Sequence, residues 1–347
     1  MTAITRRTAL LLSAAAVGAS MFSRPARADE TLVVVGQGGS YQDGQRQAYF
    51  TPFAKATGIR VLDQSPADVG KFQAMVESGN VEWDVVDVGQ DFVLRGSKLG
   101  LLEPVDYKAI GIDQGDFPAA LVTDHSVPSI VWSTTINYNT DLVASAKSPR
   151  SWADFWDVKK FPGDRTLPKL PVNLFEIALL ADGVEPAKLY PLDVDRAFRS
   201  LDRIKPAVHV WWETAAKAEE LLADGEVAYS AAGNARVQKA RRDGAAVALN
   251  WEQAIQTSQS WVIPRGAKNK AAALKFLAFA SSPERQAALT KFIDYGPSNK
   301  RAFQFIADGT ELPTSPALQQ RQVQTDPQWW AENYETVNDR FNHWLLK

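Results

Sequence analysis

The stretch TLVVVGQGGSYQ, residues 31–42, decides the fold class of this chain. Five residues, 31–35, have the apolar, β-branched composition of a buried strand, and a glycine-rich turn follows them. Ser40 then precedes a helical stretch to about Thr57, and Asp43 three residues later resembles a capping box. Gly58 is well placed to end this helix. The stretch therefore predicts a strand, a tight turn and a helix.

The same alternation continues along the chain. Residues 59–62 (IRVL) predict a second strand, residues 67–77 a helix, and residues 83–89 (WDVVDVG) a third strand. Strands that alternate with helices form parallel sheets with right-handed crossovers. The fold class is therefore α/β.

Further elements extend this pattern through the rest of the chain. Residues 130–138 (IVWSTTINY) are a long β-rich run suited to crossing between two lobes, and residues 260–263 (SWVI) predict a strand that returns to the first lobe. Other predicted elements are a strand at 227–231 and helices at 151–157, 174–181, 194–204, 213–223, 234–242, 269–280 and 326–346, with one more helix starting at Pro283.

The N-terminus has the pattern of an export signal. Thr5-Arg6-Arg7-Thr8 is followed by an apolar run over residues 9–19 and by Ala26-Arg27-Ala28. A basic region, a short apolar region and a small-x-small site predict a signal peptide over residues 1–28. The paired arginines are typical of twin-arginine export, although a tail with a chance arginine pair is the alternative. The mature chain is then expected in the periplasm.

Composition narrows the classes of protein further. The chain has 347 residues, more than one hydrophobic core usually holds, so two domains are expected. Its formal charge of −2 includes four arginines of the predicted signal, so the mature chain is more acidic, which argues against nucleic acid as a partner. The absence of cysteine excludes disulfides and a lipid-modified cysteine. We expect an unanchored periplasmic protein.

No motif of catalysis or metal binding is present. His125, His209 and His343 lie far apart and have no partner at metal-ligand spacing. Strand alternation puts Asp84 and Asp87 on opposite faces of a strand, which argues against a shared metal. We therefore predict no enzyme activity, no metal and no cofactor. A carboxylate pair assembled by the fold, as in a glycosidase, stays an alternative.

Several motifs in order resemble the periplasmic solute-binding proteins of ABC importers, of the spermidine/putrescine-binding type. The motifs are GGSYQ (38–42), FAKATGIRV (53–61), WDVVDVG (83–89), VPSIVWSTTINYNTD (127–141), SWADFWD (151–157), SWVIPRGAKNKAAALKFLAFASSPERQ (260–286) and DYGPSNKRA (294–302). Together they cover nearly the whole mature chain.

The resemblance implies a type II periplasmic-binding-protein fold, in which two lobes, each a mostly parallel sheet flanked by helices, enclose a ligand cleft. Lobe 1 would take residues 29–133 and regain 261–302. Lobe 2 would take residues 134–260, with the C-terminal helices of 303–347 packed on it. The family implies a monomer that closes on a small solute and delivers it to a permease of the inner membrane.

The chain departs from the polyamine-binding pattern at several positions. Gln259 stands where these relatives carry a ligand-binding aspartate, and Leu170 and Asn173 stand in place of their acidic pair. Ala231 replaces a tryptophan, whereas Tyr295 is kept. A long polyamine with two anchored ends is therefore not favoured, and a small amine-containing solute is.

The candidate ligand-binding residues combine aromatic, amide and charged side chains. An arginine with a carboxylate in one cleft suits an ω-amino acid, whereas aromatic rings with Asp91 suit a small amine or a quaternary ammonium. For the tryptophans the alternative is core packing, and for Asp91 and Arg236 it is a solvated surface charge. The candidates are Gln37, Tyr41, Gln90, Asp91, Trp132, Asn173, Trp212, Glu213, Arg236, Gln259 and Tyr295.

Two rival functions stay open at this point. A ferric-ion-binding protein of the same two-lobed shape is one, although the adjacent tyrosines typical of that class are absent. A periplasmic enzyme on this scaffold is the other.

Overall fold

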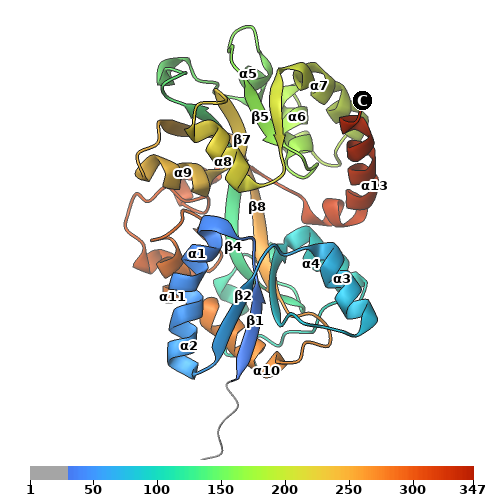
Figure 1. Cartoon of the computed structure of the whole chain (residues 1–347), viewed down its shortest axis with the longest axis vertical. Helices are drawn as coiled ribbons and strands as arrows, with labels where there is room; N and C mark the ends of the chain where they lie inside the picture. Colours follow the sequence, from blue (N-terminus) through green and yellow to red (C-terminus); the bar gives the residue numbers. More distant parts are fainter. Residues whose placement is uncertain (1–29) are drawn as a thin grey trace, which may run out of the picture.

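The structure is a computed structural model that describes residues 30–347, so the predicted signal peptide lies outside the described residues. Figure 1 shows two α/β lobes, one above the other, with strands β4 and β8 running between them. The α/β two-lobed fold class is thereby confirmed. Over residues 30–347, none of the helices combines the length and the apolarity that a membrane span requires.

Ten strands form one continuous sheet within the described residues, with the path β2-β1-β3-β8-β4-β7-β5-β6. Two short strands lie off this path, β10 beside β8 and β9 beside β4. The strands are β1 (Thr31–Val35), β2 (Arg60–Gln64), β3 (Val85–Gly89), β4 (Ser126–Asn139), β5 (Arg165–Pro168), β6 (Val208–Trp212), β7 (Tyr229–Gly233), β8 (Val247–Val262), β9 (Gly296–Pro297) and β10 (Gln322–Gln324).

Lobe 1 is the half built on β1, β2 and β3, which pair in parallel. Two buried clusters, one on each face of this sheet, hold alternate residues of the same strand: Val85 lies in one cluster and Val86 in the other. The helices of this half are α1 (Gly39–Gln45), a π-helical turn (Arg46–Phe50), α2 (Thr51–Thr57), α3 (Val69–Ser78), α4 (Gln90–Lys98), α10 (Lys270–Ala280) and α11 (Pro283–Leu289).

Lobe 2 is the half built on β5, β6 and β7, which also pair in parallel. Its helices are α5 (Trp152–Trp156), α6 (Leu174–Ala181), α7 (Val194–Ile204), α8 (Ala215–Ala223) and α9 (Asn234–Arg242). The last helix, α13 (Pro327–Leu345), buries Trp330, Val337, Phe341 and Trp344 in the core of this lobe. A short helix, α12 (Pro316–Gln319), precedes it.

Strands β4 and β8 belong to both lobes. They pair antiparallel from Ser126 opposite Val262 in lobe 1 to Asn139 opposite Val247 in lobe 2. Two register shifts interrupt the ladder, one between Pro128 and Ile130 and one between Thr134 and Ile136. Such irregularities bend a strand, and here they lie where the pair passes from one lobe to the other.

Three local predictions need correction. The segment predicted as a short strand at 260–263 is the end of the 16-residue strand β8. Helix α1 begins at Gly39, and Ser40 makes no capping hydrogen bond, since glycines with positive φ already turn the chain there. The helix predicted at 213–223 begins at Ala215, because residues 211 and 212 still belong to strand β6, where Trp211 packs on Phe341 and Trp344 of α13.

Candidate functional site

A cavity of about 580 Å³ lies between the lobes, beside the crossing strands. Its wall includes side chains from β4, β8 and the N-terminal ends of α1, α6 and α8, far apart in the sequence. Nine of the eleven candidate residues line it: Gln37, Tyr41, Trp132, Asn173, Trp212, Glu213, Arg236, Gln259 and Tyr295. The fold therefore brings most of the predicted set to one place.

The lobe 1 wall is built around two tyrosines. Tyr41 of α1 and Tyr295 meet edge to face, with ring centroids 4.9 Å apart. Gln37 lies in the turn after β1, and its Nε2 donates to the carbonyl oxygen of Asp87 at 2.9 Å. That bond leaves the Oε1 of Gln37 as an acceptor at the cavity wall.

A buried carboxylate lies directly behind this wall. The hydroxyl of Tyr41 donates to Asp87, and the hydroxyl of Ser129 donates to the other carboxylate oxygen at 2.8 Å. Burial raises the pKa of Asp87 to about 7, although the hydrogen bonds from Tyr41, Ser129 and Gln45 act in the opposite direction. Asp87 was not among the candidates, although a charged residue within the valine run of residues 83–89 is a recognisable signal.

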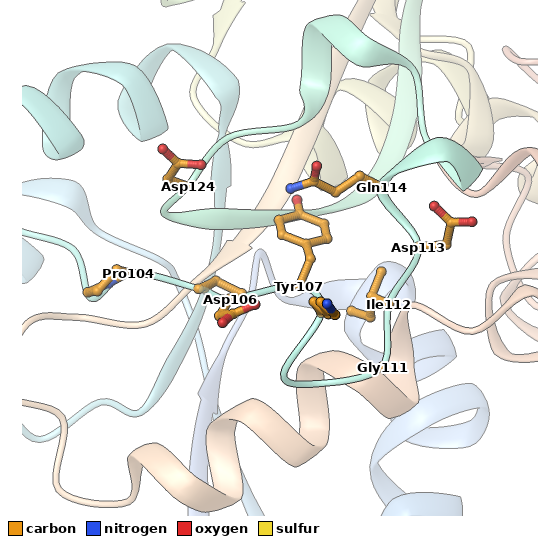
Figure 2. Close-up of a pocket in the computed structure, with 10 residues that line it drawn as sticks. Pro104, Asp106, Tyr107, Gly111, Ile112, Asp113, Gln114 and Asp124 are labelled. Atoms are coloured by element: carbon orange, nitrogen blue, oxygen red, sulfur yellow. The ribbon is translucent and has the colours of Figure 1, made fainter.

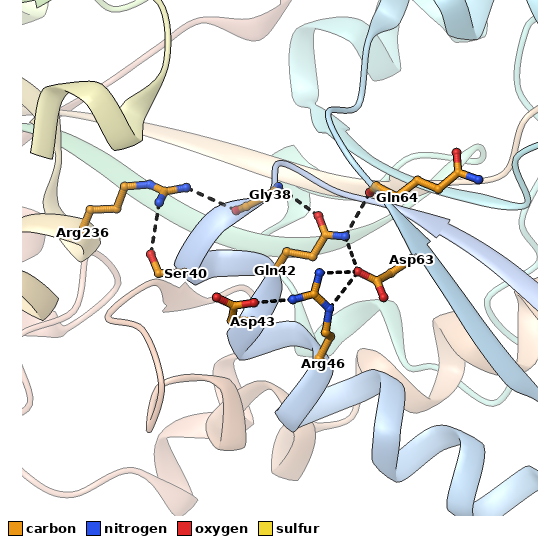
Figure 3. A network of polar contacts seen from close by, with 8 residues as sticks. All are labelled: Gly38, Ser40, Gln42, Asp43, Arg46, Asp63, Gln64 and Arg236. Atoms are coloured by element: carbon orange, nitrogen blue, oxygen red, sulfur yellow. Dashed lines mark hydrogen bonds and ion pairs between the residues drawn. The ribbon is translucent and has the colours of Figure 1, made fainter. Parts of the chain in front are cut away.

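Arg236 of lobe 2 reaches across the cavity to lobe 1. Its Nη1 donates to the Ser40 hydroxyl at 3.1 Å and its Nη2 to the Gly38 carbonyl at 3.4 Å. Figure 3 shows the side chain extended from α9 toward the start of α1. Gly39 has a φ of 59°, a conformation that favours glycine, and a Cβ atom there would lie 2.8 Å from Arg236 Nη1, so the arginine would have to shift. The alternative that Arg236 is a solvated surface charge is wrong, since it is buried.

Asn173 fixes the start of α6 to the crossing strands. Its Nδ2 donates to Thr134 Oγ1 at 3.1 Å and its Oδ1 accepts from Thr257 Oγ1 at 2.9 Å. Its φ of 67° is unusual for a residue other than glycine, and such strain collects at ligand sites. Asn173 therefore helps to shape the cavity floor.

The lobe 2 rim contains Trp212 and Glu213. Trp212 is buried and its indole nitrogen donates to the Ala231 carbonyl at 3.1 Å. Glu213 is exposed and lies 2.6 Å from Lys169, which lowers the pKa of its carboxyl. Because Lys169 already neutralises it, Glu213 is a weak candidate for the anionic partner of a ligand.

Three cavity-lining side chains have polar capacity that the protein does not use. Trp132 Nε1, Arg236 Nε and Gln259 Oε1 are buried and have no hydrogen-bond partner. Such groups cost about 1–3 kcal/mol each when unpaired, so they collect where a solute or water completes the bonding. Two are donors and one is an acceptor.

The structure does not bring Gln90 and Asp91 to this cavity. The side chain of Gln90 turns back into lobe 1, where its Oε1 accepts from Ser260 Oγ at 2.8 Å. Asp91 lies in the first turn of α4. Burial raises its pKa, although the charge of the nearby Arg95 acts in the opposite direction. Both follow the end of β3 as predicted, but the helix start directs them away from the cleft.

Among the described residues, the other large cavities share no candidate residue with this one. A more open hollow of about 740 Å³ lies on lobe 1, lined by Asp106, Tyr107, Gln114 and Asp124 (Figure 2). Within residues 30–347, the cluster with metal-ligand spacing is Glu220, Asp224 and Glu226, all exposed and outside the cleft. The cleft therefore contains no such group of metal ligands in the described part of the chain.

Two solved relatives in different states resemble this chain to different degrees. The chain is 32% identical to MotA of Agrobacterium tumefaciens B6 in complex with glucopine, covering 90% of this chain and 99% of that one, with a TM-score of 0.85. It is 31% identical to AttC of A. tumefaciens C58 in an open unliganded conformation, covering 91% and 99%, yet the TM-score is 0.68. At nearly equal identity, the overall structure is thus more similar to the relative in complex with glucopine than to the open unliganded one.

Two curated relatives cover most of the chain. A γ-aminobutyric acid-binding protein of Pseudomonas aeruginosa is 38% identical over 92% of each chain. The spermidine/putrescine-binding periplasmic protein of Escherichia coli is 25% identical over 79% of this chain and 82% of its own. The resemblance drawn from the sequence motifs is thereby confirmed.

The solved structures and the family comparison agree. The Atu4243 γ-aminobutyrate receptor is 39% identical over 91% of this chain and 97% of that one, with a TM-score of 0.83. Residues 48–320 match the family described as bacterial extracellular solute-binding protein. The chain belongs to this family, the substrate-binding components of ABC transporters, which bind a small solute between two lobes.

Proposed function

We propose that this chain binds a small ω-amino acid of the γ-aminobutyrate class in the cavity between the lobes and delivers it to an ABC permease. The observation that carries the proposal is Arg236, a buried guanidinium that lines the cavity and has no carboxylate of residues 30–347 within hydrogen-bonding range. A buried cation needs an anion, and the carboxylate of the solute would supply it.

The helix next to Arg236 also favours an anion on this side of the cavity. The first turn of α8, with Thr214, Ala215 and Ala216, lines the cavity. The N-terminus of a helix carries unpaired N–H groups and the positive end of its dipole, which favour an anion. The carboxylate end of the solute would therefore lie toward lobe 2.

The lobe 1 wall suits the ammonium end. Tyr41 and Tyr295 offer aromatic rings, and Gln37 and Gln259 offer amide oxygens. An ammonium group is stabilised by such rings and acceptors when water is excluded. The departure at Gln259 from the polyamine-binding pattern fits a solute with one ammonium group better than a chain with two.

A calorimetric titration of the mature protein tests the proposal. We expect γ-aminobutyrate to bind more tightly than putrescine, spermidine, choline or betaine. Arg236→Ala should raise Kd by about a hundredfold, because truncating one side of a buried charge pair costs about 2–5 kcal/mol. Arg241→Ala is the matched control, since Arg241 is an exposed arginine of the same helix. Absence of γ-aminobutyrate binding by the wild type overturns the proposal.

The size of the cavity favours one second candidate. A volume of about 580 Å³ lies in the range that drug-sized ligands fill, which exceeds a four-carbon amino acid. The relative MotA, with a TM-score of 0.85, was solved in complex with glucopine. Glucopine itself is therefore the second solute for the same titration.

Cellular context and lobe boundaries belong to the proposal as well. We expect export to the periplasm by a twin-arginine-like signal over residues 1–28, and action there as a monomer. Lobe 1 would comprise residues 29–133 with 261–302, and lobe 2 residues 134–260 with the C-terminal helices. The two separate hydrophobic clusters and the position of α13 on the lobe 2 core support this division.

A further inference from the structure

Asp87 stands out among the buried groups of lobe 1. It lies on β3 with no exposed surface, and its side chain enters the same face of the sheet as Gln259, because Asp87 pairs with Trp261 and Gly89 with Gln259. The Tyr41 ring alone separates its carboxylate from the cavity wall that Tyr41 lines. The carboxylate is thus one side chain away from a bound solute.

All hydrogen-bond partners of Asp87 are neutral. Tyr41, Gln45 and Ser129 donate to its two oxygens, and no lysine or arginine of residues 30–347 forms a salt bridge with it. A buried carboxylate without a cation is costly, and its field is weakly screened in the low-dielectric interior. The charge is therefore available to a cation that enters the cleft.

We propose that Asp87 is a positioning and specificity-determining residue that acts through Tyr41 and selects solutes carrying a positive charge. Because the proton of the Tyr41 hydroxyl is committed to Asp87, this ring cannot donate to the solute, and Tyr41 is held against Tyr295. The inference deepens the proposed function and rests on it. It assigns the ammonium end of the solute to the side of the cavity above Asp87.

The protonation state of Asp87 can be followed through the pH dependence of solute affinity. The titratable groups that face Asp87 are Tyr41 of α1, Tyr49 of the π-helical turn and Tyr295 after α11. Burial raises the pKa of all three. They stay neutral near pH 7, and the three histidines do not line the cavity. The pKa of Asp87 is raised to about 7, so this carboxyl changes charge there, and the Asp87→Asn variant separates its contribution from that of Glu219, whose pKa burial also raises.

Acidic solution should weaken solute binding by protonating Asp87. Protonation removes the negative charge that attracts the ammonium group, so affinity should fall as the solution becomes more acidic. Between about pH 8 and about pH 6 the ionised fraction falls about tenfold, and Kd should rise about tenfold with it. The ammonium and carboxyl groups of γ-aminobutyrate do not titrate in this range.

The experiment compares the full mature protein with Asp87→Asn and Glu176→Gln. Glu176 is a fully buried carboxylate of lobe 2 that also accepts from a tyrosine, and it does not itself line the cavity, which α6 reaches through Asn173 at its start. Calorimetric titration with γ-aminobutyrate at about pH 8 and pH 6 should show no pH dependence for Asp87→Asn, with a Kd at least about tenfold above the wild-type value at pH 8. Glu176→Gln should keep the wild-type Kd and its pH dependence.

The outcomes separate this inference from the proposed function. Wild-type affinity and pH dependence in Asp87→Asn would overturn the inference alone, and so would an equal loss in Glu176→Gln. If the wild type binds putrescine but not γ-aminobutyrate, the proposed function fails. Titration of the wild type, Asp87→Asn and Glu176→Gln with putrescine then decides the inference. If no solute with an ammonium group binds, both are overturned.

Discussion

The two lobes each bury a carboxylate that accepts a hydrogen bond from a tyrosine, but they use it differently. In lobe 1, Asp87 accepts from Tyr41, whose ring forms part of the cavity wall. In lobe 2, Glu176 of α6 accepts from Tyr190 and from the indole nitrogen of Trp330 at 2.6 Å. Burial raises the pKa of both carboxyls. The same chemical arrangement thus faces a cleft in one lobe and a helix interface in the other.

The two carboxylates differ in which elements carry their hydrogen-bond partners. Trp330 belongs to α13, so Glu176 joins the C-terminal helix to the core of lobe 2. The partners of Asp87 belong to α1 and β4, which carry cavity-lining residues of their own. We therefore expect Asp87, whose partner Tyr41 lines the cavity, to affect solute binding, and Glu176 to affect stability.

The largest expected effect separates fold from binding in lobe 2. Trp330→Ala removes a fully buried side chain and one of the partners of Glu176, so we expect a loss of about 3–5 kcal/mol in the free energy of unfolding. Urea denaturation followed by circular dichroism measures it. Folded Trp330→Ala should bind γ-aminobutyrate with the wild-type Kd.

The neighbouring tryptophan provides a matched control. Trp329 packs edge to face on Trp330 but is half-buried, so Trp329→Ala should lose less stability. A weakened affinity in folded Trp330→Ala would mean that α13 takes part in solute binding, which would contradict a purely stabilising role for Glu176 and its partners.

The next effect compares the two tyrosine hydroxyls directly. Tyr41→Phe and Tyr190→Phe each remove one hydrogen bond to a buried carboxylate, with an expected loss of about 1–3 kcal/mol in stability. In each case the hydrogen bond lowers the pKa of the carboxyl, so its removal raises that pKa further.

Solute binding should tell the two hydroxyls apart. For Tyr41→Phe the midpoint of the pH dependence of γ-aminobutyrate affinity should move above about 7, whereas Tyr190→Phe should leave it unchanged. Calorimetric titration across this pH range measures both midpoints. An unchanged midpoint in Tyr41→Phe would separate the pH dependence from Asp87.

Much of the fold could be predicted from local pattern. The helices 174–181, 194–204 and 234–242 have the predicted bounds, since helical spacing and adjacent capping signals agree there. Strand β6 was missed because residues 208–212 form a short run directly before a helix start. The lengths of β4 and β8 were underestimated because register shifts break the period of two.

The site was predictable where family motifs supplied the positions. Tyr41, Gln259 and Tyr295 follow from matched motifs, and all three line the cavity. Asp87 could not be found in this way, because its role depends on which ring covers it. That contact joins residues 46 positions apart in the sequence and exists only after β3 and α1 have packed.

The smallest expected effect concerns two carboxylates near the surface, one in each lobe. Asp63 pairs with Arg46 at 2.7 Å, and Asp182 pairs with Arg196 and Arg203 at 2.6 Å each. These arginines lower the pKa of both carboxyls, although burial opposes the effect at Asp63. Their stabilising contribution is therefore present above the unfolded pKa near 4 and is lost as the pH falls through the lower folded pKa. Asp87 has the opposite sign, since its raised pKa lowers stability as the pH rises from about 4 to about 7.

Asp63→Asn and Asp182→Asn should therefore each lose less than about 1 kcal/mol of stability near neutral pH, because paired charges at the surface contribute little. Solute affinity should distinguish them. Asp63 accepts from Gln42 Nε2 at 2.7 Å, and Gln42 Oε1 accepts from the backbone N–H of Gly38 at 2.9 Å, in the turn that Arg236 contacts (Figure 3). Loosening that turn should raise the Kd for γ-aminobutyrate by less than about fivefold in Asp63→Asn, the factor that 1 kcal/mol allows. Asp182→Asn should leave Kd unchanged in the same titration, and an equal change in both variants would show that the turn does not transmit the effect.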